Sequence, residues 1–341
     1  MNRCFALLLT IITAGCTTPR MPTFEFTKSH VQARAAGGTL TVRPKGGEPL
    51  LGELESIDGV IRFTPNFPLL EGQTYEAVFR DANLKRFICE HTFPIDAPTP
   101  VITAIYPTTD RLPANHLKFY LHFSQPMQHG DITRHFRLID LTTGKPVPEP
   151  FRETELWTDD SRRLTLWFHP GRQKTGVNLN VDLGPVLIAG RWYALEILPM
   201  WKSQAGVALE KKMEKRFATL PVDRAQPDPP KWKITAPKAG TRQSLRLTFP
   251  EPLDAVLMLH LLTVQTARGA TISGTIDLAQ NETQWIFTPR QNWHTGRHRI
   301  RIDWELEDLA GNNLARPFEV NLANPNPPEF AGPRYLKFEV R

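Results

Sequence analysis

One loop near the C-terminus places carboxylate and amide side chains around a glycine, in the order Glu-Asp-Leu-Ala-Gly-Asn-Asn over residues 307–313. Calcium takes about six to eight oxygen ligands, and side chains of these types supply them. A local role is equally compatible with the pattern: Asp308 accepts hydrogen bonds from amides of its own turn, and Gly311 provides a positive φ. Because the spacing of an EF-hand loop is absent, we predict a structural turn formed by Asp308, Gly311 and Asn312, with calcium binding as the alternative.

Other residue patterns that could carry chemistry are weak. Four histidines fall close together, but no pair has a recognisable metal-ligand spacing and no cysteine accompanies them; they are His116, His122, His129 and His135. The nucleophile elbow, the His-Glu-x-x-His motif and the phosphate-binding glycine loop are all missing from the sequence. With 35 acidic residues in the chain, a pair of glycosidase carboxylates is unsupported rather than excluded. We expect a protein that is not an enzyme and that has no metal site and no cofactor.

Tryptophans are the better indication of a binding surface. Trp157 and Trp167 flank the hairpin Leu-Trp-Thr-Asp-Asp-Ser-Arg-Arg-Leu-Thr-Leu-Trp-Phe, and Trp192 lies near a turn. Aromatic side chains at a surface bind sugars or protein partners, whereas most tryptophans of a β-sandwich belong to its core. Trp157, Trp167 and Trp192 are therefore candidates for a binding patch, with core packing as the alternative.

The N-terminal sequence predicts where in the cell the protein is located. A basic Arg3 precedes an apolar stretch over 5–12, and small residues lead to Cys16. This arrangement predicts a signal peptide, which is too short to remain as a membrane span. The ending Thr-Ala-Gly-Cys resembles the bacterial lipoprotein signal. The resemblance implies cleavage before Cys16, a diacylglycerol on its thiol, and anchoring of the mature protein by lipid alone; ordinary secretion with cleavage elsewhere is the alternative.

Charge and cysteine content agree with an envelope location. Thr17 stands where an aspartate would favour retention in the inner membrane, so by analogy with proteobacterial sorting we expect the outer membrane. Removal of Cys4 with the signal and acylation of Cys16 would leave Cys89 as the one ordinary thiol, which excludes an intramolecular disulfide. The formal charge of +6 is scattered along the chain. It predicts a solvated surface, or a weak preference for anionic envelope polymers, and no nucleic-acid partner.

A repeated pattern predicts the elements that carry these residues. An apolar strand ends three times in Phe-x-Pro, at 63–65, 168–170 and 287–289. A glycine follows each copy and precedes an alternating strand; these glycines are Gly72, Gly190 and Gly296. Repetition of this kind indicates one structural unit per copy.

Alternation within the strands predicts half-buried sheets. In 117–123 the odd-numbered positions are apolar, whereas Lys118, Tyr120 and His122 occupy the other face. A strand of period two buries one face and leaves the other wet. Short strands of this type, separated by turns, predict an all-β fold of antiparallel sandwiches.

Proline clusters divide the chain, which contains 31 prolines. They lie at 94–102, 221–232 and 323–333, and linkers of this composition are semi-stiff and should hold the modules apart. The predicted organisation is a signal peptide at 1–15, a lipidated tether at 16–21, a divergent first domain at 22–97, a second domain with insertions at 98–222, a third at 223–323, and a proline-rich tail with a short strand at 324–341.

Three sequence features of these modules resemble a known family. They are a strand ending in Phe-x-x-Pro-Met/Leu, the Phe-x-Pro centre, and the closing Asp-Leu-Ala-Gly-Asn-x-Leu. Together they resemble bacterial Ig-like modules of the SbsA type over residues 98–323. The resemblance implies tandem Ig-like sandwiches that act as spacers and interaction surfaces, without a shared active site.

We therefore expect a non-enzymatic, lipid-anchored envelope protein that serves as a structural spacer or adhesion module. Its expected partners are the membrane, through the lipid, and envelope polysaccharide or surface proteins. The alternative is a carbohydrate-binding accessory protein that uses exposed aromatic side chains.

Overall fold

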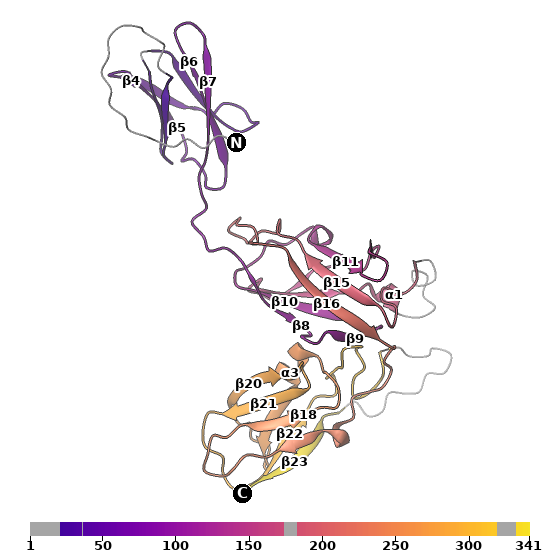
Figure 1. Cartoon of the computed structure of the whole chain (residues 1–341). Coiled ribbons are helices and arrows are strands. Elements are labelled where there is room, and N and C mark those ends of the chain that lie inside the picture. The colour runs from indigo at the N-terminus through magenta and orange to yellow at the C-terminus, as the bar shows by residue number, and fades with distance from the viewer. Residues whose placement is uncertain (1–20, 36, 174–182, 319–331) are drawn as a thin grey trace, which may run out of the picture. The chain divides into compact units, whose positions relative to one another are not determined.

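The protein is built of antiparallel β-sandwiches (Figure 1). The computed structural model describes residues 21–35, 37–173, 183–318 and 332–341. Cys16 and the predicted signal peptide lie outside these residues. The chain forms two compact units that divide after Ala97. The predicted fold class, tandem Ig-like sandwiches, is confirmed.

The first unit is a single sandwich. Its strands are β1 (Thr23–Phe26), β2 (Val31–Arg34), β3 (Thr39–Pro44), β4 (Gly52–Ile57), β5 (Val60–Pro65), β6 (Thr74–Arg80) and β7 (Arg86–Thr92). One sheet has the order β1-β2-β5-β4 and the other β3-β6-β7. Their inner faces meet in a core that includes Val42, Phe63 and Phe79.

The second sandwich begins the second unit. Its elements are β8 (Ile102–Tyr106), β9 (Arg111–Pro113), β10 (Lys118–Phe123), β11 (Phe136–Asp140), β12 (Lys145–Pro146), β13 (Leu156–Trp157), β14 (Arg163–Trp167), the short helix α1 (Pro170–Gln173), β15 (Trp192–Ile197) and β16 (Met213–Leu220). The sheets have the orders β13-β14-β10-β8 and β12-β11-β15-β16-β9. Strand β9 pairs with β16 in parallel. None of the helices in the described parts of the chain is long and apolar enough to cross a membrane.

The third sandwich completes the second unit. Its elements are β17 (Lys233–Thr235), β18 (Leu245–Thr248), the helix α3 (Ala255–Leu261), β19 (Leu262–Thr266), β20 (Gly274–Ala279), β21 (Gln284–Pro289), β22 (Gly296–Ile302) and β23 (Arg334–Val340). The sheets have the orders β17-β18-β21-β20 and β19-β22-β23.

Strand β23 corrects the predicted end of the third domain. It pairs with β22 along its whole length, from Gly296 opposite Val340 to Ile302 opposite Arg334. Phe338 and Val340 are buried in the core of this sandwich. The domain therefore extends to the C-terminus rather than ending at 323, because the strand assigned to the tail supplies core side chains.

The repeated sequence pattern corresponds to a repeated structural feature. Phe63, Phe168 and Phe287 are all buried in the cores of their sandwiches. In the first two sandwiches a tyrosine hydroxyl closes the turn before its own strand. The backbone N–H of Leu70 donates to Tyr75 and that of Ile188 donates to Tyr193, both at 2.9 Å. Tyrosine corners of this type are a feature of Ig-like sandwiches.

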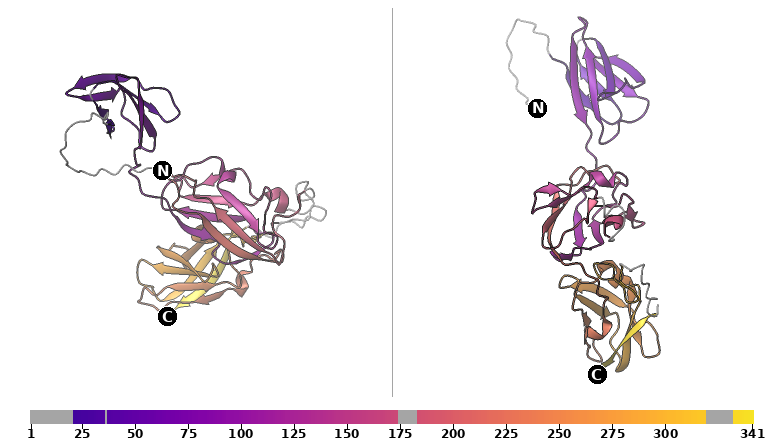
Figure 2. Two further views of the ribbon diagram at one scale, coloured as in Figure 1. Left: turned by 45° about the horizontal axis from the view of Figure 1, so that its top comes forward. Right: turned by 90° about the vertical axis from the view of Figure 1, so that its right-hand side faces the viewer.

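The polar face of β10 is not exposed to solvent, contrary to the prediction from alternation. Lys118 and Tyr120 are buried and His122 is half-buried. The second and third sandwiches lie side by side in both views of Figure 2. Asp254 of the third sandwich contacts Tyr120 and Lys118 of this face. The proline-rich linker at 221–232 thus does not hold the second and third sandwiches apart, because polar side chains of both sandwiches bond across the junction.

Candidate functional site at the junction of the second and third sandwiches

Lys118 is the centre of an ion-pair network at this junction. Its Nζ lies 3.0 Å from Oδ2 of Asp254 and 2.8 Å from Oε2 of Glu307. Register places Trp167 opposite Lys118 on β14, and Nζ lies 4.9 Å from the centre of that ring. The Tyr120 hydroxyl donates to Oδ2 of Asp254 at 2.8 Å. The second sandwich therefore supplies the cation and the third supplies both carboxylates.

Asp254 is held in place by its own helix. It is the N-cap of α3, and its Oδ1 accepts from the backbone N–H groups of Val256 and Leu257 at 3.0 and 2.9 Å. An N-cap aspartate satisfies amides that have no partner within the helix. Its second oxygen remains available for Lys118 and Tyr120. One local sequence signal, Asp followed by an apolar helix, thus fixes a side chain that serves a long-range contact.

Burial and the neighbouring charges have opposite effects on the pKa of Lys118. The side chains of Lys118 and Asp254 are 9% and 3% exposed. Burial alone would lower the pKa of Lys118, but Asp254, Tyr120 and Glu307 outweigh it and raise that pKa above its ordinary value. Burial and the neighbouring Asp254 raise the pKa of Tyr120. Lys118 is therefore a cation and Tyr120 a neutral donor at physiological pH.

A second contact joins the loop after β22 to the start of β10. The backbone N–H of Leu117 donates to the carbonyl of Leu309 at 3.1 Å. Nδ1 of His116 lies 3.0 Å from the same oxygen, and because a carbonyl only accepts, Nδ1 carries the proton. Burial is the main cause that lowers the pKa of His116 to about 3. The imidazole is therefore neutral at the pH values at which the protein would work.

Two further polar pairs span the junction. Asn115 and Asp223 form a reciprocal pair, in which Nδ2 of Asn115 donates to the Asp223 carbonyl at 2.7 Å and Asp223 N donates to Oδ1 of Asn115 at 2.9 Å. The backbone N–H and the hydroxyl of Thr108 donate to the Glu282 carboxylate at 2.8 and 2.7 Å. Contacts from several separate segments define one arrangement of the two sandwiches.

The loop over residues 307–313 has the geometry of a turn. Oδ1 of Asp308 accepts from the backbone N–H groups of Ala310 and Asn312 at 2.8 and 2.9 Å. Gly311 has a φ of 82°. The amide oxygen that a calcium ion would need from Asn312 accepts instead from Phe318 N at 3.0 Å.

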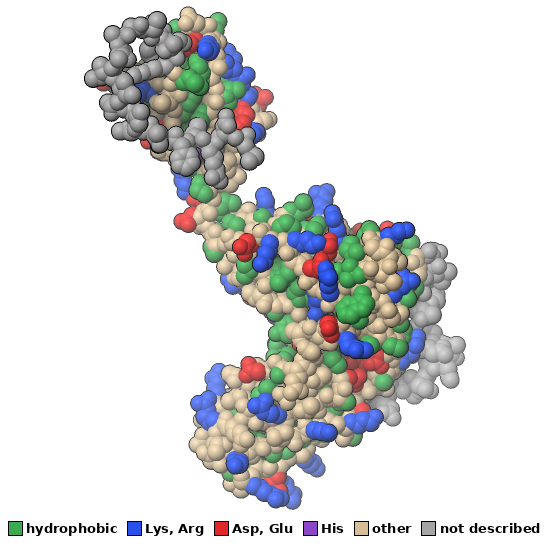
Figure 3. Space-filling view, in the orientation of Figure 1, with side chains coloured by type: hydrophobic (Ala, Val, Ile, Leu, Met, Phe, Trp, Pro, Cys, Tyr) green, Lys and Arg blue, Asp and Glu red, His purple; other side chains and the backbone are tan. Residues whose placement is uncertain are grey.

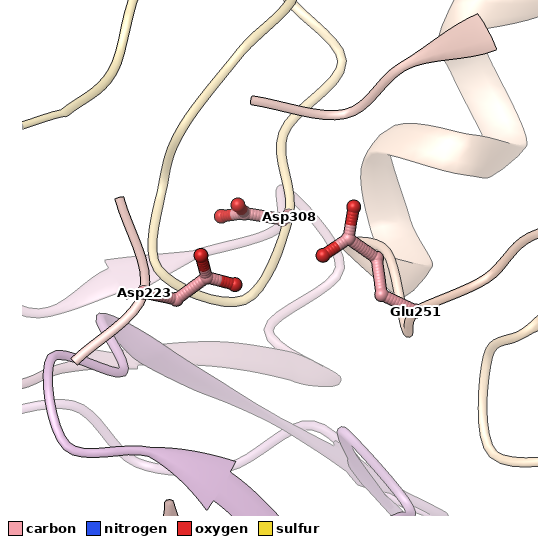
Figure 4. Close-up of side chains that lie close together, drawn as sticks. All are labelled: Asp223, Glu251 and Asp308. Carbon is pink, nitrogen blue, oxygen red and sulfur yellow. The ribbon is translucent and has the colours of Figure 1, made fainter. Parts of the chain in front are cut away.

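Asp308 also belongs to a group of three carboxylates (Figure 4). Asp223 comes from the linker, Glu251 from the segment between β18 and α3, and the ligand atoms of the three lie within 4.8 Å of one another. They line a cavity of about 220 Å³. Such a set can share protons or surround a hard cation. Sequence reasoning missed Asp223 and Glu251, because neither stands in a motif with Asp308.

Burial makes this cluster sensitive to pH. Burial is the main cause that raises the pKa of Asp308 from 3.8 to about 7, and Asp223 and Glu251 raise it further against hydrogen bonds from Asn312. A carboxyl with a raised pKa binds more protons in the folded state. Its contribution to stability is therefore complete at low pH and is lost as pH rises through about 7.

Replacement of Asp308 by asparagine should stabilise the protein at pH 8, although it alters a buried hydrogen-bonded side chain. Asparagine has no charge beside Asp223 and Glu251, yet keeps an oxygen for the amides of the turn. We expect a gain of about 1–3 kcal/mol in the free energy of unfolding at pH 8, and none at pH 4. Urea denaturation at several pH values measures it.

The titration of His116 allows a second test of the Asp308→Asn prediction, through the pH dependence of stability. Its lowered pKa contributes stability above 6.5 that is lost as pH falls toward 3. In the wild type this opposes the effect of Asp308 across the acidic range, so Asp308→Asn should become the more acid-sensitive protein. Asp277→Asn, an exposed aspartate of the same sandwich, serves as the control. Parallel pH profiles for all three proteins would contradict the assignment.

The structure does not bring the three candidate tryptophans together. Trp157 packs inward, with its ring stacked on His129 at 4.8 Å and in contact with Trp201. Trp167 lies at the junction beside Lys118. Trp192 is 50% exposed and belongs to the other sheet of the second sandwich. The three side chains therefore do not form one patch, and Trp192 is the exposed one among them, whereas Trp157 and Trp167 are half-buried.

Comparison with known proteins leaves the function open. No protein-family model matches the chain, and no curated protein matches it. Similar solved structures include the N-terminal part of the bacterial S-layer protein SbsC, at 12% identity over 60% of this chain and 40% of that one, with a TM-score of 0.25.

Two other solved structures are similar over most of the chain. The FN1–FN3 domains of chicken CNTN1 have 11% identity over 94% of this chain and 98% of that one, with a TM-score of 0.21. SGBP-B of the Bacteroides ovatus mixed-linkage glucan utilization locus, in complex with a mixed-linkage heptasaccharide, has 10% identity over 90% and 63%, with a TM-score of 0.19. These scores are too low to assign a function, which must rest on the residues of this chain.

Proposed function

We propose that the chain is a non-enzymatic lipoprotein of the cell envelope that acts as a structural spacer and interaction module. The observation that carries this proposal is the buried network around Lys118, Asp254 and Glu307. A chain of independent modules needs no such network. A spacer that holds a surface at a fixed orientation does, because buried charges tolerate few alternative arrangements.

The sequence supports the location part of the proposal. The Ala-Gly-Cys ending of the apolar segment resembles a lipoprotein signal, and the module motifs resemble SbsA-type Ig-like domains of envelope proteins. Anchoring by a diacylglycerol on Cys16 would place the first sandwich after a tether of a few residues. The expected membrane is the outer one, by analogy with sorting at Thr17.

Replacement of Cys16 by serine tests the anchor, because a hydroxyl cannot form the thioether to the lipid. We expect the wild type to incorporate labelled palmitate and to sediment with membranes, and Cys16→Ser to do neither. Mass spectrometry of the mature N-terminus should find a lipidated Cys16 as the first residue.

Cys4→Ser is the matched control, since Cys4 would leave with the signal peptide and its variant should be labelled and anchored like the wild type. An unmodified mature terminus at any other residue would refute the anchor. Equal labelling of the wild type and Cys16→Ser would refute it as well.

Carbohydrate binding through Trp192 is the second candidate, and a specific observation favours it. Trp192 lies on the outer face of the five-stranded sheet, where Ala218 of β16 is its cross-strand partner. Leu141 is the neighbour of Trp192 on the side opposite Ala218, and its N–H donates to the Trp192 carbonyl at 2.8 Å. The Leu141 side chain is exposed. An exposed indole in an apolar strip is suited to stacking on a sugar ring.

Trp192→Ala should abolish binding of neutral oligosaccharides if this second function holds. Titration of the full chain with cellohexaose, maltohexaose and chitohexaose, followed by calorimetry, measures it. Tyr335→Ala is the control, because Tyr335 is an exposed aromatic residue of the third sandwich and should not affect binding. Absence of binding to all three sugars would remove this candidate and leave the spacer function untouched.

A further inference from the structure

A cavity lies in the third sandwich, in the loops that join β19 to β20 and β21 to β22. Its volume is about 430 Å³, within the range of small-molecule sites. Apolar side chains, Ile272, Pro289 and Trp293, form part of its wall. Basic, amide and hydroxyl side chains line the rest; the chief ones are Arg290, Gln291, Asn292, His294, His298 and Thr271. Arg290, Asn292 and His294 are exposed, so the cavity opens to solvent.

Buried aromatic residues hold the wall of this cavity in place. Trp293 and His298 are 3% and 6% exposed, and their rings meet edge to face at 5.5 Å. Nε1 of Trp293 donates to the Gln243 carbonyl at 2.7 Å. Nδ1 of His298 lies 3.0 Å from the Gly296 carbonyl and therefore donates to it. A ligand would thus meet a loop that is already ordered, which reduces the entropy lost on binding.

The charge of the cavity distinguishes it from three other cavities of the second unit. None of the described residues that line it carries a carboxylate. The cavities lined by Glu149, by Asp160 and by Asp308 each include at least one. The side chain of Arg290 forms no ion pair or hydrogen bond with the described residues. A basic group is therefore available at the mouth of the cavity.

The surroundings reinforce this sign of charge. Acidic residues of the third sandwich, among them Asp254, Glu282 and Glu307, are engaged at the junction with the second sandwich. On the face of the third sandwich seen in Figure 3, basic side chains predominate away from that junction. An anion approaching the cavity would meet a favourable field.

We propose that this cavity binds a sugar that bears an anionic group. The guanidinium of Arg290 and the imidazole of His294 engage the anion, because charge-assisted hydrogen bonds are the strongest available there. The amides of Gln291 and Asn292 and the hydroxyl of Thr271 match sugar hydroxyls, which both donate and accept. The site is separate from Trp192 and does not depend on the lipid anchor.

Calorimetry on the full chain tests the proposal with four probes: glucose 6-phosphate, glucuronate, glucose and inorganic phosphate. We expect at least one of the two acidic sugars to bind, and glucose and phosphate to bind at least about tenfold more weakly, because each lacks one half of the contacts. The comparison between glucose 6-phosphate and glucuronate identifies the anion as phosphate or carboxylate.

Arg290→Gln should lower the affinity for the acidic sugar by about tenfold or more, which is the usual effect of losing a hydrogen bond to a charged group. Arg268→Gln is the matched control, because Arg268 is exposed on the neighbouring loop but does not line the cavity. Equal losses in both variants would reduce the effect to general electrostatics and overturn the proposal. It would also be overturned by absence of binding to both acidic sugars, or by binding of glucose or phosphate as tight as theirs.

Discussion

Replacement of Lys118 by methionine should lower the free energy of unfolding of the second unit by about 3–5 kcal/mol, the usual cost of leaving buried charges without their partner. Methionine keeps the length and apolar stem of lysine but removes the cation. Asp254 and Glu307 would then repel each other with little screening by solvent, because their side chains are only 3% and 24% exposed. Denaturation in urea, followed by tryptophan fluorescence, measures the loss.

Lys212→Met is the matched control for this experiment. Lys212 also forms two ion pairs within the second sandwich, with Glu196 and Glu214, but its side chain is 45% exposed. Solvent screens exposed pairs, so the control should unfold at nearly the same denaturant concentration as the wild type. If Lys118→Met behaved like Lys212→Met, the junction would not be a buried ionic contact.

Replacement of Gly311 by alanine should be nearly as damaging, for two separate reasons. The φ of +82° disfavours any side chain, and a Cβ at this position would lie 2.2 Å from Cδ1 of Leu117 and 3.2 Å from Cδ2 of Phe318. Left-handed backbone costs about 1–2 kcal/mol for a residue other than glycine, and overpacking about 1–3 kcal/mol. We expect a total loss of about 2–5 kcal/mol by denaturation.

Gly240→Ala separates these two causes. Gly240 has a φ of +71° in the same sandwich, but a Cβ there would meet nothing within 4 Å. It should show the conformational penalty alone. Because Leu117 belongs to the second sandwich, Leu117→Ala should recover part of the loss in a double-mutant cycle with Gly311→Ala. Equal effects of the two glycine variants, with no coupling to Leu117, would mean that the loop does not pack on the second sandwich.

Local patterns in the sequence were sufficient to predict the sandwiches. The Phe-x-Pro repeat placed Phe63, Phe168 and Phe287 in three cores, and alternation identified which residues of β10 share a face. These signals are local because side-chain period and turn chemistry depend on neighbours in the chain. The geometry around Asp308 follows from the same kind of signal.

What covers a face could not be predicted in the same way. Alternation separates Lys118 and Tyr120 from the apolar residues of β10, but a buried ionic face and a solvated one have the same sequence pattern. The carboxylates that meet Asp308 come from Asp223 and Glu251, at positions that only the folded chain brings together. Strand β23 was recognised by its alternation, whereas its pairing with β22 is a long-range contact.

The tryptophans show the same limit for the candidate binding site. Trp157 and Trp192 both lie near turns in the sequence. The packing of His129 and Trp201 on Trp157 leaves that ring half-buried. Exposure is therefore a property of the assembled sandwich, and residue type alone did not separate the two.

We expect the second and third sandwiches to form one rigid body. Residual dipolar couplings of backbone amides in β10 and β22, measured on the full chain, test it most directly. The structure predicts that a single alignment tensor fits both sandwiches in the wild type, and that Lys118→Met requires two. Different tensor magnitudes for the two sandwiches of the wild type would show independent motion and would contradict the claim.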